Sequence, residues 1–461
     1  YSLLYNTTGT GNSALGKGAL QTNTTASYNT ALGENALLAN TTGASNVAVG
    51  NTALTANTTG TQNTAIGTSA LAANIIDDDN TAIGYNAMVA NVSGNRNVAV
   101  GSLALDANTT ADGNTAIGYQ SLTTNTTAEN NTAVGFNALR LNETGANNVA
   151  VGSAALDQNT TGTRNIAIGS AALDANTTAN YSTAIGYNAL GASNGESNVA
   201  IGDQALVANT SGTFNVAVGR DSLYTNTTAS NNTAVGYYTL QANTTGEQNT
   251  AMGSLSMDAN TTGSYNSAIG YNSMGANTTG VRNAALGYSA LGANTTGDYN
   301  VAVGMYSLDA NTTADNNTAV GYNALTANTT GAYNVAVGAN ALDANTTASN
   351  NVGIGQSALG ANTTGANNVA MGYGSGQRNT TAGNNTFIGH LTGEYNTTGA
   401  SNVAVGSLAL DANTTASDCT AVGTNALSTN TVGQSNTAVG TSALQANLNG
   451  TRNTAVGRTK P

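Results

Sequence analysis

A tract of about seventeen residues repeats along the whole chain, and this period constrains the fold more than any other feature. Its form is close to Asn-Thr-Ala-Ile-Gly-x-x-Ala-Leu-x-Ala-Asn-Thr-Thr-Gly-x-x, and the opening Asn recurs from Asn12, Asn29 and Asn46 to Asn453. One residue is missing between Ser182 and Asn198. A short period that fills the chain predicts a linear array of repeats. We therefore predict one continuous array over residues 1–461, with 27 copies and irregular copies around residues 373–395.

Each copy is numbered here from its opening Asn as position 1. Positions 2 to 4 carry β-branched or other apolar residues around a central Ala, as in Val47-Ala48-Val49, which favours a strand. Position 5 is Gly in every copy and predicts a corner with a positive φ or a close backbone approach. Positions 8 to 11, residues 53–56 in this copy, are predicted to form a second short strand. The Asn-Thr-Thr-Gly tract that follows is predicted to be a turn.

Neither Leu nor Ile recurs at helical spacing within a copy, and two turns leave no room for an ordinary helix. Parallel stacking of one copy on the next explains why identical residues recur at a constant offset. The predicted fold is an all-β, parallel β-solenoid with about 17 residues per coil and about 27 coils. Ala at positions 3, 8 and 11 and Leu at position 9 would form apolar ladders. Asn at positions 1 and 12 would form polar ladders, each amide donating to one neighbour and accepting from the other.

The predicted strand also suggests an interaction surface. Side chains at positions 2 and 4 point one way, and Ala and Gly at positions 3 and 5 point the other. If the small residues fill the coil, apolar side chains face outward in coil after coil, which predicts self-association. The opposite assignment would give a monomer whose outer face carries small residues. The residues assigned to this self-association stripe are Val47, Val49, Ile66, Ile83, Val98, Val100, Ile117 and Val134.

Composition and charge exclude several classes of function. The net charge is −12 with only ten Lys and Arg residues, so no basic surface is expected to bind nucleic acid. No apolar stretch is long enough for a membrane span. The scattered position-10 aspartates, such as Asp106, Asp157 and Asp174, suit an exposed column in which neighbouring like charges would repel one another. The single cysteine, Cys419, replaces an opening Asn, either as a tolerated substitution or as a link to another chain.

No recurring constellation of catalytic side chains is visible, so we expect neither an enzyme nor a bound cofactor. His390, the only histidine, lies in an irregular copy where Gly376 and Gly393 replace Leu while Phe387 replaces Ala, which predicts a volume exchange. The only metal-ligand candidates are Asp77, Asp78 and Asp79, for which a solvated acidic turn is the alternative.

Two further surface features concern binding and modification. Tyr recurs at position 6, where it could face a ligand such as a sugar or pack on a neighbouring coil or chain. The ligand-facing candidates are Tyr85, Tyr119, Tyr187, Tyr271 and Tyr322. The Asn-Thr-Thr turn also matches the N-glycosylation pattern, and the sequence does not separate that use from turn chemistry.

The motif resembles that of a known family. Residues 266–270 (Asn-Ser-Ala-Ile-Gly) and 12–16 (Asn-Ser-Ala-Leu-Gly) resemble the YadA-like head repeats of trimeric autotransporter adhesins. Residues 80–88 and 317–325 also look like repeat regions of tail-fibre-type proteins. The resemblance implies a left-handed parallel β-roll, a homotrimer, and an inter-chain stripe at positions such as Val47 and Val49. The family coil is shorter, so the Asn-Thr-Thr-Gly turn would be an outward enlargement.

These features together lead to one expected function and its alternatives. We expect a structural surface fibre or adhesin-type rod, located outside the cell or on a virion, which self-associates and binds a host-surface glycan or protein receptor. A phage tail-fibre shaft is the closest alternative. A Thr-rich solenoid that binds ice or carbohydrate is an alternative of another class, although adjacent Thr residues on an extended chain would face opposite ways.

Overall fold

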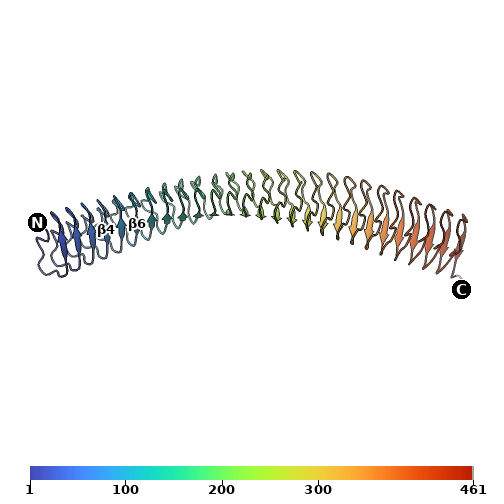
Figure 1. Ribbon diagram of the computed structural model, residues 1–461, viewed down its shortest axis with the longest axis horizontal. Coiled ribbons are helices and arrows are strands. Elements are labelled where there is room, and N and C mark those ends of the chain that lie inside the picture. Colours follow the sequence, from blue (N-terminus) through green and yellow to red (C-terminus); the bar gives the residue numbers. More distant parts are fainter. Residues whose placement is uncertain (459–461) are drawn as a thin grey trace. The chain divides into compact units, whose positions relative to one another are not determined.

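The computed structural model describes residues 1–458, and this part of the chain is an all-parallel β-solenoid without a helix (Figure 1). The chain divides into two compact units, Tyr1–Ser230 and Asn231–Pro461, built from the same coil. In both units each coil contributes one short strand, and the strands of successive coils lie side by side (Figure 1). The predicted solenoid class is therefore confirmed.

The first unit contains thirteen strands of three residues each: β1 (Ser13–Leu15), β2 (Thr30–Leu32), β3 (Val47–Val49), β4 (Thr64–Ile66), β5 (Thr81–Ile83), β6 (Val98–Val100), β7 (Thr115–Ile117), β8 (Thr132–Val134), β9 (Val149–Val151), β10 (Ile166–Ile168), β11 (Thr183–Ile185), β12 (Val199–Ile201) and β13 (Val216–Val218).

The second unit contains the remaining strands: β14 (Thr233–Val235), β15 (Thr250–Met252), β16 (Ser267–Ile269), β17 (Ala284–Leu286), β18 (Val301–Val303), β19 (Thr318–Val320), β20 (Val335–Val337), β21 (Val352–Ile354), β22 (Val369–Met371), β23 (Thr386–Ile388), β24 (Val403–Val405), β25 (Thr420–Val422), β26 (Thr437–Val439) and β27 (Thr454–Val456).

Equivalent residues of successive coils are paired, as the period predicted. Val47 of β3 pairs with Thr64 of β4 in a parallel register, seventeen residues apart. Outside the strands the hydrogen bonds between coils recur every seventeen residues. The N–H of Leu54 donates to the carbonyl of Ala70 at 2.9 Å, and the equivalent N–H of Leu71 donates to the carbonyl of Ala87 at 3.0 Å. One repeat therefore closes one coil, and each position of the repeat forms a column of stacked side chains.

The interior of each coil is narrow and filled by small or unbranched residues. In the third coil Ala48, Ala53 and Leu54 (positions 3, 8 and 9) are fully buried, as predicted. Ala56 at position 11 is only half-buried, so that column contributes less to the core than the sequence suggested. Burial of small side chains yields little apolar area per residue, and the hydrogen bonds between coils must supply much of the cohesion.

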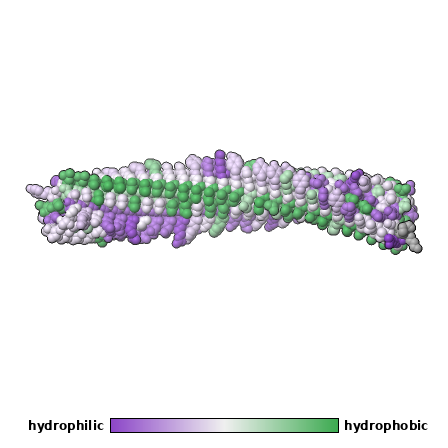
Figure 2. Space-filling model, turned by 60° about the horizontal axis from the view of Figure 1, so that its bottom comes forward, coloured by the Kyte–Doolittle hydropathy of each residue, from purple (hydrophilic) through white to green (hydrophobic). Residues whose placement is uncertain are grey.

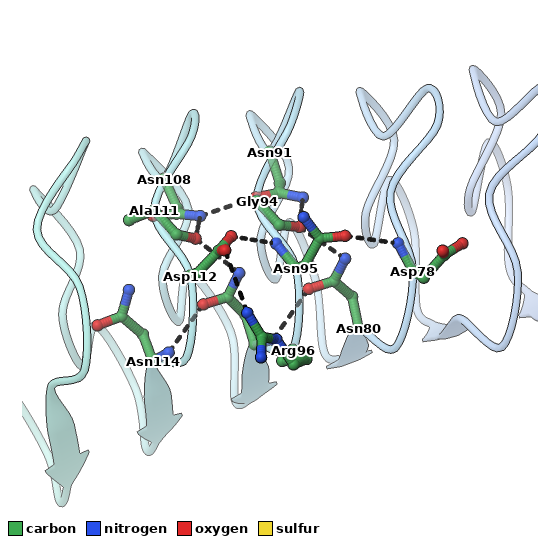
Figure 3. A network of polar contacts seen from close by, with 11 residues as sticks. Asp78, Asn80, Asn91, Gly94, Asn95, Arg96, Asn108, Ala111, Asp112 and Asn114 are labelled. Atoms are coloured by element: carbon green, nitrogen blue, oxygen red, sulfur yellow. Dashed lines mark hydrogen bonds and ion pairs between the residues drawn. The ribbon is translucent and has the colours of Figure 1, made fainter.

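Two columns of buried Asn provide many of those hydrogen bonds (Figure 3). At position 12 the Nδ2 of Asn108 donates to the Oδ1 of Asn91 at 2.7 Å, which is the amide ladder that the sequence predicted. At position 1 the pattern differs, because Oδ1 of Asn80 accepts the backbone N–H of Asn97 at 3.0 Å. The Nδ2 atoms of Asn80 and Asn91 both donate to the carbonyl of Gly94, at 2.8 and 2.9 Å. The two columns thus meet on one carbonyl and close the turn.

The prediction of a second strand at positions 8 to 11 is wrong. In the third coil residues 51–56 form a turn, and Thr52 and Leu54 have φ values of 54° and 51°. A left-handed conformation costs a residue with a Cβ about 1–2 kcal/mol. Each coil offsets that cost by burying the Leu side chain and by directing its N–H toward the next coil. Apolar residues at these positions resemble a strand in sequence, but alternating left-handed residues bend the chain.

The position-5 glycines form the corner that the sequence predicted. Gly67 has a φ of 133°, and a Cβ built on it would lie 2.4 Å from the carbonyl oxygen of Gly84 in the next coil. Both the backbone conformation and the space therefore require glycine here.

The shortened coil replaces both of its ladder asparagines by serine. Ser182 at position 1 still donates its N–H to Asn165 at 2.9 Å. Ser193 at position 12 accepts from Asn209 at 3.1 Å but leaves the buried Oδ1 of Asn176 without a partner in the described chain. The serine side chains thus carry the ladders across the shortened coil with one bond lost.

The irregular coils confirm the predicted volume exchange. Phe387 is fully buried at position 3. Its ring lies where side chains at position 9 would otherwise be, since a Cβ on Gly376 or Gly393 would come within 2.8 or 2.6 Å of ring carbons. One aromatic ring therefore fills the space of two missing Leu side chains.

Candidate interaction face

The strands present a row of apolar side chains on the outer surface of each unit. Ala48 at the centre of β3 is fully buried, whereas Val47 and Val49 on either side of it are half-buried. This alternation recurs in nearly every strand, so the assignment with Ala inside and Ile or Val outside is confirmed. We call positions 2 and 4 together the apolar strip. Figure 2 shows rows of apolar residues that run from coil to coil on the face turned toward the viewer.

The structure brings the predicted stripe residues together on β3 to β8. They form adjacent columns, with Val47, Val98, Val49 and Val100 half-buried and Ile66 and Ile117 38% and 39% exposed. Ile83 and Val134 are half-buried. Position 4 is Leu, Ile, Val or Met in every coil, from Leu15 to Val456. A column that stays apolar while partly exposed in every coil is typical of a surface that is covered by a partner.

The position-6 aromatics are exposed, as predicted, and several pack on one another between coils. Tyr85, Tyr187 and Tyr322 are 57%, 56% and 51% exposed. Tyr119 stacks on Phe136 of the next coil with ring centroids 5.7 Å apart, and Tyr271 stacks on Tyr288 at 5.3 Å. His390 stacks in the same way on Tyr373, at 5.5 Å. Rings that stack along a column are held by their neighbours and still expose an edge for a further contact.

Position 17, which precedes the buried Asn of the next coil, carries a second exposed column that the sequence reading missed. Its aromatic members are Tyr28, Tyr181, Phe214, Tyr265, Tyr299 and Tyr333, all exposed. Arg164 lies over the ring of Tyr181, with its guanidinium carbon 5.4 Å from the ring centroid, and donates to the hydroxyl at 2.8 Å. The signal was present in the sequence, because these residues recur at one position of the repeat.

The prediction of an exposed aspartate column at position 10 is wrong. Asp157 is 9% exposed and accepts two hydrogen bonds from Arg140, at 2.9 and 3.1 Å. Asp106 and Asp411 are half-buried, and the Oδ1 atom of each is buried without a hydrogen-bond partner in the described chain. Burial raises the pKa of the Asp106 and Asp411 carboxyls above the usual value of 3.8.

The three acidic residues of the candidate metal site lie in three different columns. Asp77 is 7% exposed, and burial, followed by the charges of Asp112 and Asp78, raises its pKa. Asp78 accepts from the backbone N–H and the hydroxyl of Thr61, at 2.6 and 2.9 Å. Asp79 is exposed. Within residues 1–458 no group of three or more His, Cys, Asp or Glu side chains is arranged to hold a metal ion.

Cys419 is buried and takes the place of a ladder Asn. Its N–H donates to Asn402 at 3.0 Å, and its Sγ donates to the carbonyl of Gly433 at 3.3 Å. Burial raises the pKa of the Cys419 thiol. This position favours the tolerated substitution over a link to another chain.

The Asn of the Asn-Thr-Thr pattern is also inaccessible in the folded coil. Asn57 is fully buried, and its Nδ2 donates to Asn40 at 2.9 Å and to Gly60 at 3.0 Å. An N-linked glycan would replace a hydrogen of that Nδ2, so the pattern serves the turn in the folded chain. The hydroxyl of the following Thr58 donates to the carbonyl of Ile75 at 3.0 Å. This Thr hydroxyl is therefore already used in a hydrogen bond within the solenoid.

The chain matches no protein-family model and no curated protein sequence. Residues 1–458 contain no long apolar helix of the kind that crosses a membrane.

Proposed function

We propose that the chain is a structural surface fibre that self-associates through the apolar strip and projects from a cell or a virion. One observation carries the proposal: position 4 is apolar in every coil although the fold leaves it partly exposed. A solenoid that stays monomeric would not need an apolar residue at position 4 of every coil, because strand positions that face solvent accept polar residues. Covering the strip would remove a long row of apolar side chains from water.

A second copy of the chain is the partner that fits the strip along its length. A surface that contacts every coil must repeat at the coil spacing of about 4.8 Å. Another copy has that spacing, whereas a globular receptor covers only a few coils. The resemblance to adhesin head repeats points to a homotrimer, and the apolar composition of the strip is compatible with that arrangement. A shaft of a phage tail fibre is the same proposal with a different point of attachment.

The test is the mass of the native particle. We expect the full chain to sediment at three times its 45.4 kDa chain mass at micromolar concentration. A variant that alternates Glu and Lys at position 4 of every second coil, beginning Val49→Glu, Ile83→Lys and Ile117→Glu, should sediment as a monomer. The matched control places the same charges at position 14 of those coils, beginning Thr59→Glu, Ser93→Lys and Thr127→Glu, and should remain associated. A monomeric unmodified chain with native circular dichroism would refute the proposal.

A further inference from the structure

The apolar strip distinguishes one alignment of two copies from another only weakly, because position 4 is Leu, Ile, Val or Met in every coil and position 2 is mostly Thr or Val, which are similar in size. Sliding one copy by a single coil brings Val or Ile of position 4 against the equivalent side chain of the next coil. Within the first unit such a slip keeps an apolar side chain at position 4 opposite another in every coil except those at the two ends, although it changes which Thr and Val residues of position 2 meet. A strand pattern that varies little from coil to coil specifies register weakly. Side chains outside the strip that differ more in size and charge are therefore needed to specify one axial alignment strongly.

The columns at positions 6 and 17 are the next exposed side chains along the chain on either side of the strip. They hold thirteen of the 19 Tyr residues and two of the 3 Phe residues. They also hold seven of the ten Lys and Arg residues, but only four of the 22 Asp and Glu residues. Tyr and Arg are the residues most enriched at the energetic centres of protein interfaces. The composition of the two columns therefore matches an interface better than it matches the rest of this acidic surface.

These bordering side chains are held in place before any partner binds. Arg282 lies between two aromatic rings of position 17, with its guanidinium carbon 5.5 Å from the Tyr265 centroid and 5.4 Å from that of Tyr299. It also donates to the Tyr299 hydroxyl at 2.6 Å. Tyr119 and Phe136 hold each other by stacking at position 6. Side chains that are already ordered lose less entropy when they are buried in an interface.

The bordering columns vary much more in size and charge from coil to coil than the strip does. Position 6 in the first unit reads, for example, Ser102, Tyr119, Phe136 and Ser153 in four successive coils. An order that does not repeat gives a different set of contacts at each axial alignment of two copies. We propose that the side chains at positions 6 and 17 set the axial register in which copies of this chain associate. This inference rests on the proposed self-association, for which the strip supplies the attraction and the bordering columns supply the alignment.

The test maps which coils face one another in the assembled fibre. In a Cys419→Asn background, single cysteines are placed at position 4 as Val100→Cys, Ile117→Cys or Val134→Cys, and the chains are co-assembled in pairs and oxidised with copper phenanthroline. Disulfide-linked peptides are then quantified by mass spectrometry. We expect each cysteine to link to one partner coil with a yield about tenfold above that of the coils on either side, which corresponds to about 1.4 kcal/mol.

Two variants test the bordering columns directly. In the first variant, every Tyr, Phe and Arg at positions 6 and 17 becomes Ser, a residue already present there at Ser102 and Ser45. Each cysteine should then form disulfides with several partner coils instead of one. In the second, the whole bordering pattern of one chain is moved by one coil, which preserves composition, and its links to an unmodified chain should shift by one coil. Control chains carry an equal number of Thr→Ser changes at position 14.

The outcomes separate the two proposals. Association with a single register that neither variant alters would overturn the register inference and leave self-association standing. Links spread over several coils in the unmodified chain would overturn the inference in the same way. A chain that does not associate and forms no links would overturn both.

Discussion

The Nδ2 of Asn57 donates to the Oδ1 of Asn40 in the preceding coil, 2.9 Å away, and the Oδ1 of Asn57 accepts from Asn74 at 3.0 Å. A position-12 amide of a regular coil therefore bonds to its neighbours on both sides, at a position that is fully buried. Many of the hydrogen bonds that join the coils depend on this column and on its counterpart at position 1. The energetic consequences can be measured one coil at a time, because each coil contacts only its neighbours.

Asn57→Ala should destabilise its own coil and the one before it. The change leaves the Oδ1 of Asn40 without its donor, and an unsatisfied buried acceptor costs about 1–3 kcal/mol. Hydrogen–deuterium exchange read by mass spectrometry should show faster exchange in residues 40–74. Thr59→Ala, in the exposed part of the same turn, is the matched control and should leave exchange unchanged. Equal exchange in the two variants would mean that the ladder contributes nothing measurable.

Phe387→Ala should open a cavity that the surrounding coils cannot fill. Gly376 and Gly393 offer no side chain to take its place, so the free energy of unfolding should fall by about 3–5 kcal/mol. The triple variant Phe387→Ala, Gly376→Leu, Gly393→Leu restores the usual pattern and should recover most of the loss. Leu is compatible with the backbone there, since Gly393 has a φ of 58° and Leu54 has one of 51°. Failure of the triple variant to recover stability would contradict the volume exchange.

Gly67→Ala should be poorly tolerated at the coil corner. The new Cβ would meet the Gly84 carbonyl, and the backbone would be strained at a φ of 133°. Strain and overpacking together should lower the free energy of unfolding by about 2–5 kcal/mol. Gly360→Ala is the control, because position 10 has a normal φ and carries Ala72 in another coil. Thermal unfolding of the two variants is followed by circular dichroism. Similar unfolding midpoints would contradict the requirement for glycine at the position-5 corner.

Asp106→Asn should stabilise its coil at neutral pH and have no such effect at pH 3.5. Burial raises the pKa of Asp106 in the folded chain above its unfolded value of 3.8, so the ionised form is the less favourable one in the fold. The penalty is full above the folded pKa, declines as the pH falls through it, and is absent below 3.8. Since the side chain is half exposed, the gain should be under about 1 kcal/mol. Exchange protection of residues 105–108 measured at both pH values checks the sign.

Arg140→Met should destabilise its region by about 1–3 kcal/mol, because Asp157 would lose both charge-assisted hydrogen bonds while it remains buried. The control is Arg96→Met. The Arg96 side chain is 69% exposed and lies 3.4 Å from Asp112, so its loss should cost less than about 1 kcal/mol. The difference in thermal midpoint between the two variants is the decisive measurement. A larger effect for Arg96→Met would contradict the assignment of the Arg140–Asp157 pair as the buried one.

The candidate face was only partly visible in the sequence. Alternation around Ala48 predicted that Val47 and Val49 face outward, since side chains of an extended strand point to opposite sides. Strand patterning did not predict the exposed column of Tyr181 and Arg164 at position 17, because these residues have left-handed backbone conformations with φ values of 60° and 57°. Strand alternation does not apply to such residues, so their exposure was decided by the bend of the chain.

The sequence by itself determined the coil, its parallel stacking and the buried columns at positions 1, 3, 8, 9 and 12, because a fixed period places like residues on like residues. The tertiary structure decided the path of the chain between the strands. Leu54 was expected in a strand and lies in a left-handed turn, and Asp106 was expected in water and is half-buried. Both outcomes depend on backbone hydrogen bonds to the next coil and on the space left between coils. A one-dimensional pattern records which residues stack, but it does not record how the backbone bends to let them do so.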